Sequence, residues 1–110
     1  MKKILFLLVF FISFCFAESC TTNRCLAKIE KLYVRTTGNI SVGTTQDERL
    51  ANCTPTSGVY FTLDMSTPNA DIIYSTLLSA QLSNKVVNIR IYENTEGCKI
   101  SYVVLDSTLN

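Results

Sequence analysis

The side chains with the clearest chemistry in this sequence are its cysteines. The chain has five of them and no histidine, and one lies within an apolar N-terminal run. The other four are Cys20, Cys25, Cys53 and Cys98. In a short exported domain, an even number of cysteines favours disulfide bonds over metal or redox chemistry. A zinc site would need a C-x-x-C pair or histidine, which the sequence lacks, so we predict no metal ion and no cofactor.

Four cysteines allow three disulfide pairings. We favour Cys20 with Cys25, a local clip near the start of the exported domain, and Cys53 with Cys98, because each of these two comes just before a predicted strand. The second bond would close a loop of roughly 45 residues and stabilise the fold by about 3 to 4 kcal/mol, because it restricts the unfolded chain. The other two pairings stay open.

Asp47 and Glu48 are adjacent carboxylates of the kind that acid–base catalysis uses. Such catalysis combines a carboxylate with a nucleophile, a histidine or a metal ion. The sequence has no motif of these kinds, so we interpret both residues as part of a solvated loop and predict no enzyme activity.

The N-terminal segment has the layout of a secretory signal peptide. Lys2 and Lys3 precede an apolar run over residues 4–16, and the small Ala17 follows at the expected cleavage edge. The run is shorter than the roughly 20 apolar residues that span a bilayer. We predict a signal peptide over residues 1–17. An N-terminal anchor and a lipoprotein site at a nearby cysteine are alternatives.

The rest of the chain, residues 18–110, is predicted to be one domain exported to the periplasm or secreted, without stable membrane insertion. The full chain has ten Lys or Arg and nine Asp or Glu, a net charge of +1. Loss of Lys2 and Lys3 would make this balance slightly negative. Nucleic-acid binders carry a clear cationic excess because they neutralise phosphates, so we predict no nucleic-acid partner.

The elements that must position these side chains begin with a predicted hairpin. Its first strand covers residues 27–36, and its apolar phase changes between Ile29 and Leu32, so we expect a bulge or sharp bend there. The second strand covers residues 40–44. The polar segment over residues 45–58 predicts an ordered loop held by its cysteine.

The central stretch, residues 59–92, predicts a strand, a helix and a strand. Apolar residues alternate with polar ones over residues 59–64 and 87–92. Between them, apolar residues recur at helical spacing, with Thr67 as the expected N-cap and Ser83 near the end.

A fifth strand is predicted over residues 99–105. It is apolar on both faces: Ile100, Tyr102 and Val104 alternate on one, which puts Val103 and Leu105 on the other, outward face. A second subunit or the N-terminal segment of the chain would then cover that face.

The order strand, strand, strand, helix, strand, strand predicts a mainly β fold with one helix (α+β). More specifically, we expect an OB-fold-like five-stranded Greek-key barrel, with the helix between its third and fourth strands. A small α+β sandwich, with the helix across an open antiparallel sheet, would use the same elements and stays open as an alternative.

The predicted barrel resembles the B subunits of the subtilase cytotoxin and pertussis-like toxins. The resemblance lies in the export signal, the disulfides, the opening strand IEKLYVRTTGNISVGT and the passage YSTLLSAQLSNKVVNIRIY. The chain is also similar to a wider group of small exported bacterial proteins with one cysteine before the third strand and one before the fifth. The resemblance covers most of the exported domain. It implies a secreted OB-fold, pentameric assembly and glycan binding, and it assigns no sugar-binding residue.

On these grounds we predict an exported, non-enzymatic, lectin-like binding module that recognises carbohydrate or a protein partner and forms a homo-oligomer. The alternative is a structural or interaction protein of the cell envelope without a glycan ligand. The candidate ligand surface combines aromatic rings, which stack on sugars, with Arg and Thr side chains, which hydrogen-bond hydroxyl groups. Its members are Tyr33, Arg35, Tyr60, Thr62, Arg90 and Tyr92.

Overall fold

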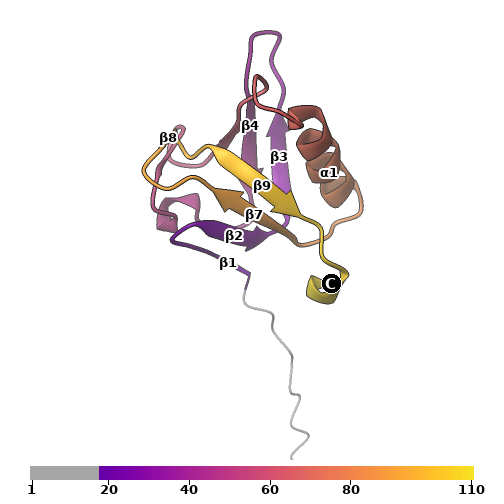
Figure 1. The fold of residues 1–110 in the computed structure, drawn as a ribbon. Coiled ribbons are helices and arrows are strands. Elements are labelled where there is room, and N and C mark those ends of the chain that lie inside the picture. Colours follow the sequence, from indigo (N-terminus) through magenta and orange to yellow (C-terminus); the bar gives the residue numbers. More distant parts are fainter. Residues whose placement is uncertain (1–17) are drawn as a thin grey trace, which may run out of the picture.

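The computed structural model describes residues 18–110, so the signal peptide predicted over residues 1–17 lies outside the described residues. The described part is mainly β with one helix, and its strands form sheets of four, three and two strands (Figure 1). No helix of this part is long and apolar enough to cross a membrane.

The four-stranded sheet is antiparallel throughout and has the order β1-β2-β7-β9. Its strands are β1 (Ser19–Thr21), β2 (Arg24–Ala27), β7 (Val87–Ile91) and β9 (Ile100–Val104). Sequence reasoning did not predict the hairpin formed by β1 and β2. Cys20 and Cys25 lie directly opposite each other in this hairpin and form a disulfide.

The other two sheets are smaller. The antiparallel three-stranded sheet contains β3 (Ile29–Tyr33), β4 (Ile40–Thr44) and β6 (Phe61–Leu63), with β4 in the middle. A parallel pair joins β5 (Thr54–Pro55) to β8 (Glu96–Gly97). Two short 3-10 helices, η1 (Glu48–Leu50) and η2 (Ser107–Leu109), complete the described elements.

The bend predicted in the first strand is confirmed, and it is larger than expected. Instead of one strand over residues 27–36, the chain leaves the four-stranded sheet after Ala27 and enters the three-stranded sheet at Ile29. The pairing register with β4 then shifts between Ile29 and Lys31. This bulge lets both Ile29 and Leu32 face the core despite their opposite sequence phase.

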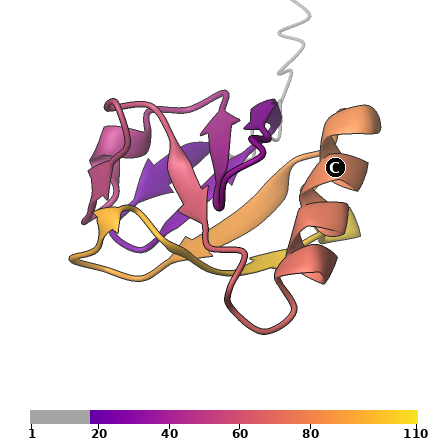
Figure 2. The same ribbon diagram turned by 90° about the horizontal axis from the view of Figure 1, so that it is seen from above.

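The helix α1 (Ala70–Leu82) lies against β3 and β9, at one side of the sheets (Figure 2). It starts later than predicted, because Thr67 is not its N-cap. The hydroxyl of Thr67 donates instead to the carbonyl of Asp64, 2.6 Å away, within the turn that precedes the helix. Asn69 occupies the N-cap position with a left-handed backbone (φ 61°).

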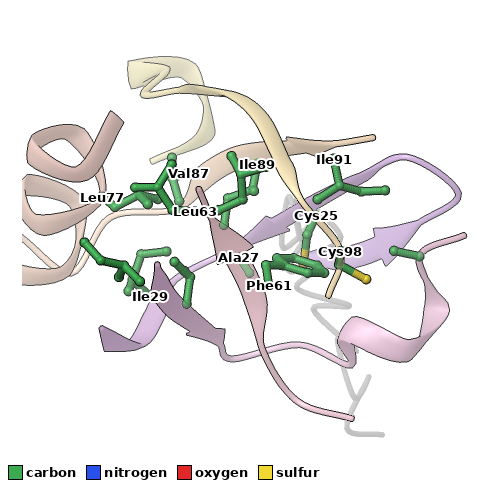
Figure 3. Close-up of a cluster of buried hydrophobic side chains, with 14 of the residues drawn as sticks. Cys25, Ala27, Ile29, Phe61, Leu63, Leu77, Val87, Ile89, Ile91 and Cys98 are labelled. Carbon is green, nitrogen blue, oxygen red and sulfur yellow. The ribbon is translucent and has the colours of Figure 1, made fainter. Parts of the chain in front are cut away.

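The core is one cluster in which both larger sheets and the helix take part. Figure 3 shows Leu77 reaching from α1 towards Val87 and Leu63. All three side chains are fully buried, as is Phe61 of β6. Burial at this depth contributes about 1.5 to 3 kcal/mol for each large apolar side chain.

The prediction that Val103 points outward is wrong. The register between β7 and β9 shifts so that Ile91 pairs with Ile100, whereas Arg90 pairs with Tyr102. The extra residue, Ser101, reverses the alternation of β9. Val103 therefore packs against the core, and Tyr102 faces outward.

Of the predicted OB-fold-like five-stranded Greek-key barrel, the structure shows the mainly β fold with one helix, and its sheets do not close into a barrel. Between β6 and β9 there is only a single parallel bridge, from Thr62 to Lys99, together with a 3.1 Å hydrogen bond from the Thr62 N–H to the Cys98 carbonyl. The reason lies just before β9, where Glu96 and Gly97 pair with β5 and Cys98 is bonded to Cys53. The backbone of Glu96 and Gly97 is thus paired with β5 and not with β6.

Gly97, just before β9, lies so close to Thr62 of β6 that no side chain fits at this position. Its φ is +82°, and an added Cβ would lie 2.8 Å from Oγ1 of Thr62. We expect Gly97→Ala to lower the free energy of unfolding by about 2 to 3 kcal/mol, because a left-handed backbone and overpacking both cost energy. Urea denaturation measures this change.

Gly38→Ala is the matched control, since Gly38 has φ +83° and no atom within 4 Å of the added Cβ. It should cost only the backbone part, about 1 kcal/mol. Equal losses in the two variants would show that the contact with Thr62 is unimportant.

Candidate functional site

Four of the six sequence candidates share the outer face of the three-stranded sheet: Tyr33, Arg35, Tyr60 and Thr62, here called the tyrosine face. In register, Ser41 of β4 lies between Tyr33 and Thr62. The rings of Tyr33 and Tyr60 meet edge to face, with centroids 6.1 Å apart. Aromatic pairs favour this geometry.

Arg35 is held in place on this face from two sides. Its guanidinium carbon lies 4.7 Å from the centroid of the Tyr33 ring, and its Nη1 donates to Oγ of Ser41 at 3.2 Å. Ser41 is buried, so the bond satisfies a polar group that water does not reach. A guanidinium has five N–H donors, so further donors are left for a ligand.

Thr62 lies at the inner edge of the tyrosine face. Its Oγ1 is 3.3 Å from Oγ1 of Thr56 and sits close to Gly97. The Thr62 hydroxyl therefore already has a hydrogen-bond partner in Thr56.

Arg90 and Tyr92 are not brought to the tyrosine face. Arg90 belongs to the four-stranded sheet, where its guanidinium carbon lies 5.9 Å from the ring centroid of Tyr102. Tyr92 follows β7, and its side chain is 55% exposed. Arg90 therefore lies on a different surface from the tyrosine face, because its strand belongs to another sheet.

A cleft of about 340 Å³ adjoins the tyrosine face and shares Tyr60 with it. Polar and charged side chains dominate its lining. The lining residues are Glu30, Lys31, Gly43, Thr44, Thr45, Gln46, Glu48, Val59 and Tyr60.

Gly43 of β4 makes room for the Tyr60 ring. A Cβ at this position would lie 3.3 Å from Cε1 of Tyr60 and 3.4 Å from Cβ of Lys31. The ring therefore lies directly over the backbone of β4, where it forms one wall of the cleft.

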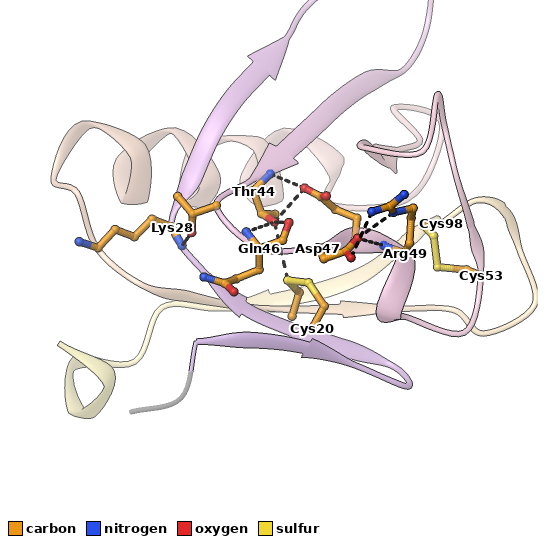
Figure 4. The surroundings of a disulfide bond; sticks show 11 residues. Cys20, Lys28, Thr44, Gln46, Asp47, Arg49, Cys53 and Cys98 are labelled. Carbon is orange, nitrogen blue, oxygen red and sulfur yellow. Dashed lines mark hydrogen bonds and ion pairs between the residues drawn. A yellow bond between two sulfur atoms is a disulfide. The ribbon is translucent and has the colours of Figure 1, made fainter. Parts of the chain in front are cut away.

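Glu48 is the residue of this site that sequence reasoning missed. Its side chain is not solvated as predicted: only 5% of the residue is exposed. Both the N–H and the hydroxyl of Thr44 donate to its Oε1, each at 2.9 Å. The hydroxyl of Thr44 also accepts from the N–H of Gln46 at 3.1 Å, which ties the loop to the end of β4 (Figure 4).

The neighbouring carboxylate, Asp47, behaves as predicted and stays exposed. Arg49 donates from Nε to Oδ1 of Asp47 at 3.1 Å, and the backbone N–H of Arg49 donates to the same oxygen. These hydrogen bonds, the side-chain one first, lower the pKa of Asp47 from its ordinary value. Asp47 thereby caps η1, the 3-10 helix that begins at Glu48.

The loop that carries Glu48 is held by a disulfide. Cys53 bonds to Cys98, the same pairing that the sequence favours, and the N–H of Asn52 donates to the carbonyl of Thr22 at 2.7 Å. Among residues 18–110, no three His, Cys, Asp or Glu side chains are grouped so that they could hold a metal ion.

The tyrosine face and the cleft together offer aromatic rings, a guanidinium, hydroxyl groups and a buried carboxylate. Such a set can bind a ligand that has apolar C–H faces and hydroxyl groups. Comparison with family models, with curated proteins and with solved structures finds no match for this chain.

Proposed function

We propose that the protein is an exported, non-enzymatic binding module that recognises carbohydrate at the cleft beside Tyr60. The observation that carries this proposal is that an aromatic ring, Tyr60, and a buried carboxylate, Glu48, line the same cleft. Specific small-molecule sites combine apolar walls with a few fixed polar groups in this way.

The carboxylate of Glu48 is suited to sugar hydroxyl groups. Within the described residues, both hydrogen bonds to this carboxylate reach Oε1, from Thr44. Oε2 can then accept from a ligand hydroxyl, while Oε1 keeps the side chain in position. A charged acceptor makes hydrogen bonds roughly twice as strong as a neutral one. The ring of Tyr60 would stack on the C–H face of the same sugar.

We further propose the OB-fold architecture and the toxin-like assembly that the sequence resembles. An OB-fold is a partly open five-stranded Greek-key barrel. The pairings β3 with β4, β4 with β6, β2 with β7 and β7 with β9 support this assignment, as does the bridge from Thr62 to Lys99. A pentamer is the expected oligomer on this proposal. Light scattering during size-exclusion chromatography measures it, and a monomer would count against it.

Export is supported by the two disulfides, which form and persist in oxidising compartments such as the periplasm and the cell exterior. The predicted signal peptide over residues 1–17 would provide the route. We propose a periplasmic or secreted location.

The alternative function, an interaction protein of the cell envelope, is favoured by one observation on the other sheet. Tyr102, Val104 and Leu105 expose 45%, 40% and 45% of their surfaces at the end of the chain. Exposed apolar groups that lie together often mark protein contacts.

A glycan array probed with the disulfide-bonded protein, followed by calorimetric titration of the best ligand, tests the carbohydrate proposal. We expect Tyr60→Ala to weaken binding about tenfold, which corresponds to the loss of about 1.4 kcal/mol of stacking and burial. Glu48→Gln, which keeps the shape but removes the charge, should weaken binding by a similar factor.

Two matched variants serve as controls. Tyr92→Ala removes an exposed tyrosine away from the cleft, and Asp47→Asn removes the charge of the exposed neighbouring carboxylate. Both should bind as the unchanged protein does. A folded protein that binds no glycan, or equal losses in control and test variants, would refute the proposal.

A further inference from the structure

The outer face of the four-stranded sheet carries two rows of side chains that the proposed carbohydrate site does not use. The pairing register aligns Thr21, Arg24, Arg90 and Tyr102 in the first row, and Ser19, Leu26, Asn88 and Val104 in the second. The residues between them in β2 and β7 are buried, so these rows point away from the core. We call this surface the arginine face.

Arg24 and Arg90 lie directly opposite each other on neighbouring strands. Like charges in this position destabilise a sheet. Neither row contains Asp or Glu, and the ion pair of the described residues joins Arg49 to Asp47 elsewhere. The free protein thus holds two uncompensated positive charges side by side.

The first row also has the features of a protein-binding surface. The guanidinium of Arg90 lies over the ring of Tyr102, which restricts its motion. Tyr102 and Val104 are 45% and 40% exposed. Arginine and tyrosine are the side-chain types that dominate protein interfaces, with apolar neighbours that exclude water.

Asn88, in the second row, has a side-chain oxygen that is buried and lacks a hydrogen-bond donor within the described residues. Such unsatisfied groups are rare in folded proteins and cost energy.

We propose that the arginine face docks a partner protein whose contact surface is acidic. A carboxylate opposite Arg24 and Arg90 would compensate both charges, and the apolar side chains of the second row fit a protein surface better than a single sugar or ion. A two-fold dimer of this chain through the same face is disfavoured, because it would bring the arginine rows of two copies together. The proposal holds whether or not the cleft binds carbohydrate.

Nuclear magnetic resonance titration of the ¹⁵N-labelled protein tests this site. The probe is a short peptide of alternating Glu and Leu, and its control has Gln in place of Glu. We expect the acidic peptide alone to shift the signals of Arg24, Arg90 and Tyr102, less so as salt is raised. Arg24→Gln and Arg90→Gln should each weaken binding about tenfold. Arg35→Gln, on the tyrosine face, should leave it unchanged.

The melting temperature provides a second test. If Arg24 had only a structural role, its replacement would lower the melting temperature. Because Arg24 opposes a like charge, Arg24→Gln should raise the melting temperature while it weakens peptide binding. A lower melting temperature with unchanged binding would overturn the proposal. So would the absence of any peptide-induced shift, tighter binding of a sulfated oligosaccharide at the same arginines, or self-association that Arg90→Gln abolishes.

Discussion

Replacing both Cys53 and Cys98 with serine is expected to lower the free energy of unfolding by about 3 to 4 kcal/mol. The bond joins residues 45 apart in the sequence, so its loss lets the unfolded chain explore many more conformations. Cys98 is fully buried, so the serine at this position would bury a hydroxyl group, which adds to the loss. Urea denaturation of the double variant measures the change.

The bond between Cys20 and Cys25 gives the matched comparison, because it closes a loop of only 5 residues. Its double serine variant should lose about 2 kcal/mol on the same loop-entropy argument. A larger loss there than at Cys53 and Cys98 would show that the hairpin of β1 and β2, and not the long loop, limits stability.

The long disulfide also links stability to the candidate site. It holds the segment that carries Glu48, whose carboxylate must remain against Thr44 to face the cleft. We therefore expect reduction to weaken ligand binding before the protein unfolds globally, because loops lose order at lower cost than cores.

Leu77→Ala is the second substitution with a large expected effect, a loss of about 3 to 4 kcal/mol. Leu77 is fully buried where α1 meets both larger sheets, so the shortened side chain leaves a cavity that the surrounding strands cannot fill. Thermal or urea unfolding followed by circular dichroism measures the loss.

Leu82→Ala is the control for Leu77→Ala. It makes the same chemical change on the same helix, but Leu82 is 78% exposed. Its effect should stay within about 0.5 kcal/mol. If the two variants lost similar stability, helix propensity and not core packing would explain the result.

Much of the fold follows from local patterns. The strands over residues 40–44 and 87–91 lie within one residue of the predicted bounds, because apolar residues alternate with polar or small residues in each. The bend between Ile29 and Leu32 was also predictable, since a change of apolar phase within one strand requires a bulge.

Other elements carried no such signal. The strands β1, β5 and β8 have two or three residues each, too few to show a period. They form because the two disulfides and the neighbouring strands hold them in place. The bulge at Ser101 likewise depends on the pairing of β9 with β7, so the outward direction of Val103 was predicted wrongly.

The sequence predicted only part of the candidate site. Tyr33, Arg35 and Tyr60 do meet on one face, as outward positions of neighbouring strands can. Arg90 lies on another sheet, and nothing in the local sequence states which sheet a strand will join. Glu48 was missed because its burial depends on the turn of the loop back towards Thr44.

By itself, the sequence determined the mainly β character, the single amphipathic helix and the need for a bend in the first strand. These features depend on spacings of two to four residues, which the chain shows directly. Only the tertiary structure decided which outward side chains share a surface, that Glu48 lies in a cleft and that Arg24 faces Arg90. Those outcomes depend on pairing between distant strands, where a shift of one residue reverses every side chain.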